Sequence, residues 1–358
     1  MNVISIIMAI FSVLAAIDLI FGSRFGLGKE FEKGFMLFGT MALSMIGMIV
    51  ISPFIAEVMH PLFDFVYKIF KIDPSIIPAI FFANDMGGAP LATSICKDAD
   101  IGGFNALVVS SMMGATISFT IPFALGLVKK EKHRWLLLGL LCGIVTIPIG
   151  CFVSGLILSI PLIPLLVDLL PIIIFSIIIA IGLIKFPSLC VKIFSVFGVF
   201  IKTVIIIGLS LSLIKFLTGF EVIKGLATLE EGAAVCLNAS AVMTGAFPLM
   251  LIVSRLLKKP LSKLGSKLGI SEISAVGFVS SLATSATTFG VMNDMDDKGT
   301  MLNSAFAVSG AFTFAGHLAF TLAYNADYLI PVIIGKLISG IFAIIVAAII
   351  FKRVSKAA

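Results

Sequence analysis

Charged residues are scarce in this chain. Asp, Glu, Lys and Arg together make up 12% of its 358 residues, whereas hydrophobic residues make up 59%. A soluble domain carries about a quarter charged residues, so this composition excludes a soluble protein and predicts an all-α polytopic integral membrane protein. The net charge of +6 lies in short loops. That pattern is typical of membrane orientation and contact with membrane lipid, and it argues against nucleic acid as a partner.

Cysteine, tryptophan and tyrosine are also rare. The five cysteines are scattered and no two form a C-x-x-C pair, so we expect packing residues and predict neither a metal site nor a cofactor. One Trp and three Tyr give little material for the aromatic cage that usually holds a quaternary ammonium. The sequence lacks G-x-G-D pairs, H-E-x-x-H motifs and P-loops, which argues against an intramembrane enzyme and leaves no catalytic residue to name.

Apolar runs long enough to cross a bilayer recur along the chain. We predict nine spanning helices, at about residues 2–21, 35–59, 104–128, 135–160, 166–186, 196–217, 231–257, 301–324 and 329–351. Two more segments, at about 75–95 and 271–293, are rich in small and polar residues and are predicted to be broken. These segments leave no stretch for a soluble domain.

Basic loops predict the topology. Residues 129–134, 255–267 and 352–356 carry clustered Lys and Arg and are expected in the cytoplasm. Three crossings after the second cluster would put the tail outside. If residues 271–293 enter and leave the membrane on one side, only two crossings remain. We therefore predict that this segment is re-entrant and that the C-terminus is cytoplasmic.

A weak internal repeat favours the same arrangement. An offset of 199 residues aligns Ser75 with Ser274 and Asp98 with Asp297, and it lays one broken segment on the other. If both broken segments are re-entrant, each half of the chain crosses the membrane four times. The single helix between the halves then gives the second half the opposite orientation in the membrane. We predict a first repeat over 1–165, a linking helix over 166–186 and a second repeat over 187–358. Such inverted-topology repeats underlie alternating access.

The most informative motif is Asn84-Asp85, in the middle of an apolar stretch and followed at once by Gly87, Gly88 and Pro90. A carboxylate at bilayer depth costs about 2.5–3.5 kcal/mol, so it is a functional hypothesis by default. Broken backbone at that depth lines a protein or water cavity, and many transporters build their solute site there. The alternative is that Asp85 only caps the free N–H groups of the broken helix.

Hydroxyl side chains dominate the second broken segment. Residues 280–290 include Ser281, Thr284, Ser285 and Thr288. Such hydroxyls can replace the water around a solute, or they can simply permit close helix packing. Because the repeat brings this segment opposite Asp85, we predict that Thr284 and Ser285 lie near the substrate.

Polar residues also recur in the last two predicted spans. Asn303, Gly310 and His317 are spaced by seven residues, so on one helix over 301–324 they would share a face. His317 could sense pH or relay a proton, or it could be a neutral histidine bonded to a carbonyl. Lys336 lies deep in the last span, where it must snorkel or pair with a carboxylate that the sequence does not identify.

Several longer stretches carry a family resemblance: FEKGFMLFG, ANDMGG, SSMMGATISFTIPFALG, GIVTIPIGC, MDDKGTMLNSAFAVSGAFTFAGHLAF and IPVIIGKLISG. They extend from about Asp18 to Gly340 and resemble the bacterial ethanolamine transporter family of ethanolamine-utilisation operons, EutH. The resemblance implies uptake of ethanolamine across the bacterial cytoplasmic membrane. It also implies that the D-M-G-G at residues 85–88, the acid at Asp296 and the histidine at His317 are shared by the family.

The residues suit such a substrate. Ethanolamine is a small primary amine, largely protonated at neutral pH, so Asp85 would pair with its ammonium and Asn84 would bond its hydroxyl. We predict an ethanolamine permease that could form a homo-oligomer. The alternative is an ion-coupled carrier for another small polar solute, and uniport, proton coupling and sodium coupling all stay open. The predicted substrate-binding residues are Asn84, Asp85, Gly87, Gly88, Ser281, Thr284, Ser285, Thr288, Asn303 and His317.

Overall fold

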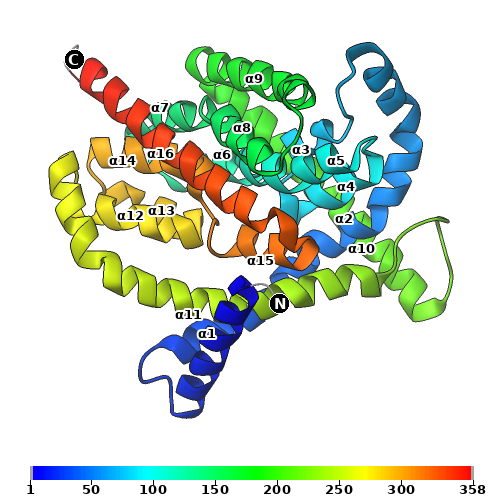
Figure 1. Ribbon diagram of the computed structural model, residues 1–358, viewed down its shortest axis with the longest axis horizontal. Helices are drawn as coiled ribbons and strands as arrows, with labels where there is room; N and C mark the ends of the chain where they lie inside the picture. Colours follow the sequence, from blue (N-terminus) through cyan, green and yellow to red (C-terminus); the bar gives the residue numbers. More distant parts are fainter. Residues whose placement is uncertain (1–2, 356–358) are drawn as a thin grey trace.

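The computed structural model describes residues 3–355, except for the side chains of residues 62, 66, 187–188, 191, 194–195 and 257–266. The described part consists of helices and connecting turns (Figure 1). Its α-helices are α1 Val3–Ile20, α2 Leu27–Phe70, α3 Ile76–Phe81, α4 Gly88–Ile95, α5 Ala99–Phe104, α6 Ile121–Leu127, α7 His133–Ile144, α8 Ile147–Ile157, α9 Leu162–Lys185, α10 Pro187–Thr218, α11 Leu229–Leu268, α12 Glu272–Ala283, α13 Ser285–Gly290, α14 Asp297–Gly310, α15 Gly316–Tyr324 and α16 Leu329–Val354. Short 3-10 turns are η1 Asn84–Met86, η4 Lys130–Lys132, η5 Met292–Asp294 and η6 Ala326–Tyr328, and π-helical stretches are η2 Asn105–Gly114 and η3 Thr116–Thr120.

Within the described residues, eight helical segments are long and apolar enough to cross a membrane. They are Val3–Ile20, Leu27–Pro61, Ala99–Leu127, Lys130–Ile157, Leu162–Lys185, Val196–Thr218, Leu229–Leu256 and Ala326–Val354. Each coincides with a predicted span, so the expectation of an all-α polytopic membrane protein is confirmed. The expectation of nine continuous spans is wrong. The segment 301–324 is interrupted, because α14 ends at Gly310 and α15 begins only at Gly316.

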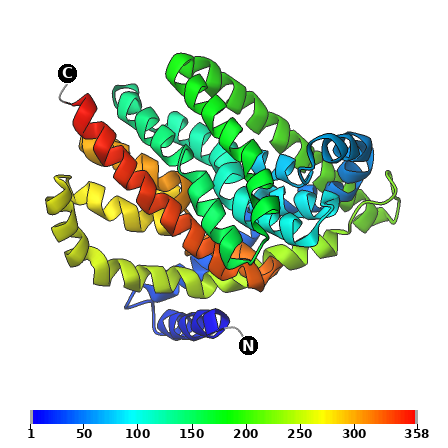
Figure 2. The same ribbon diagram turned by 45° about the horizontal axis from the view of Figure 1, so that its top comes forward.

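The longest helices frame the molecule. In both ribbon views α11 runs along one side, and α1 lies on its outer face, where it also packs against α2 (Figures 1 and 2). The hydroxyls of Ser12 and Thr244 join α1 to α11 at 2.8 Å. On α9 and α10, isoleucine, leucine and valine side chains are exposed along much of the helix. Exposed apolar surface of this kind is expected where a helix faces lipid tails.

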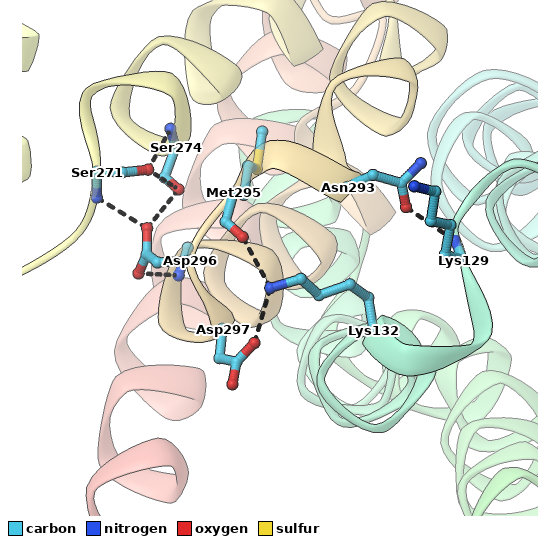
Figure 3. Close-up of polar contacts among 9 residues, drawn as sticks. Lys129, Lys132, Ser271, Ser274, Asn293, Met295, Asp296 and Asp297 are labelled. Atoms are coloured by element: carbon cyan, nitrogen blue, oxygen red, sulfur yellow. Dashed lines mark hydrogen bonds and ion pairs between the residues drawn. The ribbon is translucent and has the colours of Figure 1, made fainter.

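The second broken segment forms a hairpin whose ends meet (Figure 3). Asp296, the N-cap residue just before α14, accepts hydrogen bonds from the Ser271 backbone N–H at 2.8 Å and the Ser274 hydroxyl at 2.7 Å through one oxygen. Its other oxygen accepts from the Gly299 N–H at 3.0 Å. One carboxylate therefore joins the start of α12 to the start of α14. We call residues 271–296 the second hairpin.

These bonds make Asp296 a cap that depends on its charge. Partial burial opposes ionisation, but hydrogen bonds from Ser271, Ser274 and Gly299 outweigh it and lower the pKa of Asp296 below the ordinary 3.8. Because the pKa of Asp296 is lower in the folded state, its charged form stabilises the fold fully above the ordinary value of 3.8. This stabilisation is lost as the pH falls from 3.8 through the lowered pKa.

Asp296→Ala is expected to lower stability by about 1–3 kcal/mol, since two backbone N–H groups lose their acceptor. The melting temperature of the purified protein in detergent measures this. Asp297→Asn is the matched control, because the Asp297 side chain is 52% exposed and its ion pair with Lys132 lies at the surface. Equal melting temperatures for the two variants would contradict the capping role.

The first broken segment is closed by an aspartate in the same way. Asp73 precedes it and accepts from the Ser75 N–H at 2.9 Å and the Ser75 hydroxyl at 2.6 Å. Its second oxygen accepts from the backbone N–H groups of Lys97 and Asp98, at 2.9 and 3.0 Å. The two ends of this segment therefore lie side by side, joined by Asp73. We call residues 73–98 the first hairpin.

The two hairpins open toward opposite ends of α16. Next to the start of α16, the Tyr328 hydroxyl donates to the Asp100 carbonyl oxygen at 3.4 Å, just after the first hairpin. Near the other end, the rings of Phe351 and Trp135 lie 4.8 Å apart, beside a cluster that includes Ile270. A helix of 26 residues is about 39 Å long, so the hairpin openings lie on opposite faces of the molecule.

Candidate functional site

Backbone at the tip of the first hairpin is irregular. After α3, Phe82 and Ala83 are extended, the turn η1 follows, and Gly87 takes a φ of 97° that favours glycine. Two serines, one on η2 and one on η3, satisfy the freed backbone groups. Ser110 donates to the Phe82 carbonyl at 2.6 Å, and the Ala83 N–H donates to the Ser118 hydroxyl at 3.2 Å. We call residues 82–87 the first break.

This bonding bears on the role of Asp85. The freed Ala83 N–H donates to a serine hydroxyl, so the carboxylate of Asp85 is not required to accept from it. The structure therefore gives no support to the capping alternative at these positions. Asp85 remains 27% exposed through its side chain, whereas the neighbouring Asn84 is fully buried.

Close packing holds the first break against η2. A Cβ at Gly114 would overlap the Phe82 carbonyl oxygen, and a Cβ at Gly88 would overlap the Ser110 hydroxyl and the same oxygen. These glycines let two backbones approach closely enough for the serine bonds to form.

Gly114→Ala is therefore expected to displace the first break, with a loss of stability of about 1–3 kcal/mol from overpacking. Melting temperature and the yield of monodisperse protein would report it. Gly126→Ala, in the same continuous helical segment, provides the control, because no atom lies within 4 Å of a Cβ there. A Gly114→Ala protein as stable as Gly126→Ala would rule out this tight fit.

Three charged or titratable side chains from distant parts of the chain meet beside the first break. The Nε2 atom of His317, on α15, lies 4.0 Å from Oδ1 of Asp85. On the other side of the ring, Nδ1 lies 3.1 Å from Nζ of Lys336, on α16. Lys336 Nζ also donates to the Ser111 carbonyl oxygen at 2.7 Å. Lys336 and His317 are almost completely buried, at 1% and 2% exposure.

The interruption of the segment 301–324 positions His317. Ala311 is extended and Phe312 adopts a left-handed φ of 61°. The N–H groups of Phe312 and Phe314 donate to the carbonyls of Ser281 and Leu282, at 3.0 and 2.9 Å, instead of to their own helix. We call residues 311–315 the third break. Because α12 supplies these acceptors, the chain can leave the helix at bilayer depth without unpaired backbone groups.

The third break also corrects the expected polar stripe. Asn303 lies on α14 and His317 on α15, so they do not share one helix face. Asn303 donates to the carbonyls of Ser274 and Gly299, at 2.8 and 2.9 Å, near the opening of the second hairpin. The Phe312 ring instead packs on His317, with centroids 5.1 Å apart. Of the expected stripe, only His317 is placed next to Asp85.

The predicted hydroxyl residues divide into two groups. Ser281 and Thr288 bond each other at 2.9 Å, and Thr288 donates to the Gly277 carbonyl, so both hydroxyls serve the packing of the second hairpin. The Thr284 hydroxyl accepts from the Ala286 N–H at 3.3 Å. Ser285 is fully buried and its hydroxyl has no partner. The carbonyls of Ser281 and Leu282 bond the third break, whose Phe312 ring packs on His317.

A cavity of about 640 Å³ lies between the second hairpin and α11. Its walls are mostly apolar, and Thr284 and Thr287 line it together with the charged residues Lys33, Arg255 and Glu272. Asp85 is not among the residues that line this cavity. It is therefore a separate space, on the second-hairpin side of the molecule.

Two residues at the site lie outside the predicted binding set. The sequence identifies no partner for Lys336, although a lysine deep in an apolar helix is itself a signal of function. For Phe312 the only local signals are the glycines at 310 and 316, and they do not indicate a left-handed turn at Phe312 itself. Among the described residues, no group of three or more His, Cys, Asp and Glu side chains is placed to hold a metal.

In the described part of the chain, eight membrane-length helices and a buried polar cluster at helix breaks define a multi-pass membrane protein with an internal polar cluster. The family model for the ethanolamine utilisation protein EutH matches residues 1–350, and the chain belongs to that family. This confirms the resemblance seen in the motifs.

Relatives match over nearly their full length. A protein of Listeria monocytogenes named "Probable ethanolamine permease EutH" is 40% identical over 99% of this chain and 95% of its own. A protein of the same name from Salmonella typhimurium is 36% identical over 98% and 96%. An uncharacterised Bacillus subtilis protein, YxeR, is 36% identical over 96% and 92%. No solved structure matches the chain.

Proposed function

We propose that this chain is an ethanolamine permease of the bacterial cytoplasmic membrane that binds ethanolammonium at Asp85 and carries it by alternating access. One observation carries the proposal: a partly exposed carboxylate lies at a helix break, beside a buried histidine whose ring nitrogen is 4.0 Å away. The names of the Listeria and Salmonella relatives support the choice of substrate and of a transporter over an enzyme.

The groups around Asp85 match both ends of the substrate. The ammonium would pair with the Asp85 carboxylate in a charge-assisted hydrogen bond. The amide of the adjacent Asn84 is fully buried, and neither its oxygen nor its nitrogen has a hydrogen-bond partner. A buried amide without partners costs about 1–3 kcal/mol, so the substrate hydroxyl, or water in its absence, would relieve a strain already present. Gly87 and Gly88 would let the break approach the substrate.

We also propose the inverted-repeat organisation, with repeats over 1–165 and 187–358 joined by the helix at 166–186. Matching local features support it. Asp98 and Asp296 both cap the helix after a hairpin, and Asn105 and Asn303 both reach back to the start of that hairpin. After the first hairpin the chain continues into the π-helical stretches η2 and η3. After the second hairpin, the corresponding helix is interrupted at the third break. Irregular helices of this kind are common at functional sites.

The proposed orientation places the C-terminus in the cytoplasm and treats both hairpins as re-entrant. The meeting of the ends of each hairpin supports re-entrance. The basic segment 129–134 also bonds the end of the second hairpin through Lys132 and Asp297, at 2.8 Å, and lies beside the C-terminal end of α16 through Trp135 and Phe351. These basic segments share one end of the molecule, as the positive-inside rule requires of cytoplasmic loops.

Counterflow tests the function without assuming a coupling ion. Proteoliposomes preloaded with unlabelled ethanolamine are placed in trace labelled ethanolamine, with no ion gradient or potential. We expect transient accumulation of label that empty liposomes do not show. Unrelated small polar solutes are added as competitors. If they inhibit as well as ethanolamine does, the chain is a carrier for another solute, and if no counterflow occurs, the proposed function is wrong.

A further inference from the structure

Lys336 lies where a cationic substrate would need to be accommodated. Its ammonium is 1% exposed and bonds the Ser111 carbonyl and Nδ1 of His317. The other nitrogen of the same ring, Nε2, lies 4.0 Å from Oδ1 of Asp85. One buried cation and one carboxylate thus flank a histidine, and their charges cancel. A buried ammonium without such compensation would cost several kcal/mol.

The position of Lys336 assigns the proton on His317. A charged ammonium has only donors, so the Nδ1 atom that it contacts must accept. In the neutral imidazole the proton then lies on Nε2, facing Asp85. The resting cluster therefore presents an N–H donor on the side where the ammonium of a substrate, which also has only donors, would bind.

A second cation cannot simply be added to this cluster. With ethanolammonium beside Asp85, the cluster would carry two positive charges against one negative, in a site where Lys336 and His317 are excluded from water. The Nε2–H of His317 would also face the ammonium N–H groups, donor against donor. Losing one proton removes both conflicts.

We infer that binding of ethanolammonium expels one proton from the Lys336–His317 pair, so that the carrier exchanges substrate for a proton; this inference rests on the proposed function. The Nζ–H bond of Lys336 breaks and its proton bonds Nδ1 of His317. The Nε2–H bond breaks and that proton passes to water beside Asp85. Nε2 then accepts from the substrate ammonium, and the Nδ1–H donates to the neutral amine of Lys336.

The geometry suits both states. Two acceptors 4.0 Å apart, Asp85 Oδ1 and His317 Nε2, can each accept one hydrogen of a single ammonium, whose bonds are about 2.7–2.9 Å long. Besides Asp85 and His317, Cys151 on α8 is a titratable group that interacts with Lys336, and Asp168 on α9 lies behind Cys151. Because the substrate leaves inside and Lys336 takes a proton there, the cycle moves no net charge.

Transport by the wild type is measured first. In proteoliposomes that show counterflow, a potential of 100 mV, inside negative, is expected to give no accumulation. An inside-acidic gradient of one pH unit should give about tenfold accumulation. A charged uniporter would instead accumulate ethanolammonium about 50-fold under the potential. That result would overturn the inference while leaving the proposed function intact, whereas missing counterflow would reject the proposed function.

Carriage of neutral ethanolamine would also be electroneutral, so variants of Lys336 separate the two mechanisms. In Lys336→Met the exchangeable proton is missing. We expect ethanolamine to bind without the release of one proton that a pH indicator records for the wild type, and accumulation to follow the potential. Proton release that persists in Lys336→Met would come from the substrate amine and would overturn the inference.

Lys336→Arg serves as a second variant if Lys336→Met does not fold. Arginine keeps the positive charge and a donor for the Ser111 carbonyl, but it does not lose a proton in proteins. Ethanolamine binding to folded Lys336→Arg is therefore expected to weaken at least 100-fold, with folding checked by the melting temperature. Wild-type affinity in this variant would also overturn the inference, because a neutral substrate tolerates a permanent cation.

Discussion

Asp85→Asn is expected to abolish ethanolamine counterflow. The amide has the shape of the carboxylate but no charge, so the substrate ammonium would enter a mostly buried site, where the Asp85 side chain is 27% exposed, without its counter-charge. Breaking a buried charge pair costs about 3–5 kcal/mol, which corresponds to a loss of affinity of more than 100-fold. Counterflow of labelled ethanolamine measures transport, and calorimetric titration of the purified protein measures affinity.

Asp100→Asn is the matched control for this substitution. Asp100 lies on α5, its side chain is exposed, and the bond from Tyr328 reaches its backbone oxygen, which the substitution leaves in place. We expect wild-type counterflow. If Asp85→Asn retained wild-type affinity while remaining folded, the ammonium would bind elsewhere, and the buried hydroxyl of Ser285 would be the next position to test.

Much of the first break could be predicted from sequence, because its signals are local. Two glycines and a proline directly after Asp85 disfavour a continuous helix, and a carboxylate in an apolar stretch is costly unless it has a function. The small and polar residues of both segments likewise predict that each is broken. The bonds from Asp73 and Asp296 that close the hairpins could not be predicted, because they join residues more than 20 positions apart.

The third break could not be predicted. Its sequence, Ala311-Phe312-Thr313-Phe314-Ala315, contains neither glycine nor proline and reads as part of an apolar helix. Its conformation depends on two carbonyls of α12, which accept the N–H groups that the helix gives up. A tertiary contact of this kind overrides local propensity, and the glycines that flank the break, Gly310 and Gly316, are the only local signal of it in the sequence.

At the Asp85 cluster, too, some features can be recognised in the sequence and others depend on the fold. Asp85 and His317 were each singled out as polar residues at bilayer depth, but their meeting with Lys336 depends on packing among η1, α15 and α16. The seven-residue spacing that linked His317 to Asn303 was misleading, because it assumed one uninterrupted helix. Single residues with a high burial cost can be recognised in sequence, whereas their partners require the fold.

Gly316→Leu is expected to block the site sterically without unfolding the protein. Gly316 begins α15, and a Cβ added there would lie 3.8 Å from Oδ2 of Asp85 and 3.7 Å from the Phe312 ring. These are ordinary contact distances, so a methyl group fits. The longer leucine would extend its branches over the Asp85 carboxylate and occupy the space proposed for the ammonium. We expect at least a 100-fold loss of ethanolamine affinity and no measurable counterflow.

Gly316→Ala separates steric blocking by the leucine side chain from the effect of losing the backbone freedom of glycine. Alanine removes the same backbone freedom and adds only the Cβ, so its counterflow should stay within a few-fold of the wild type. Melting temperatures of both variants should lie close to that of the wild type, since the Cβ that both side chains share meets only ordinary van der Waals contacts. If folded Gly316→Leu transported normally, the substrate would not pass between α15 and Asp85. The proposed position of the ammonium between Asp85 and His317 would then be untenable, even if Asp85 itself proved essential.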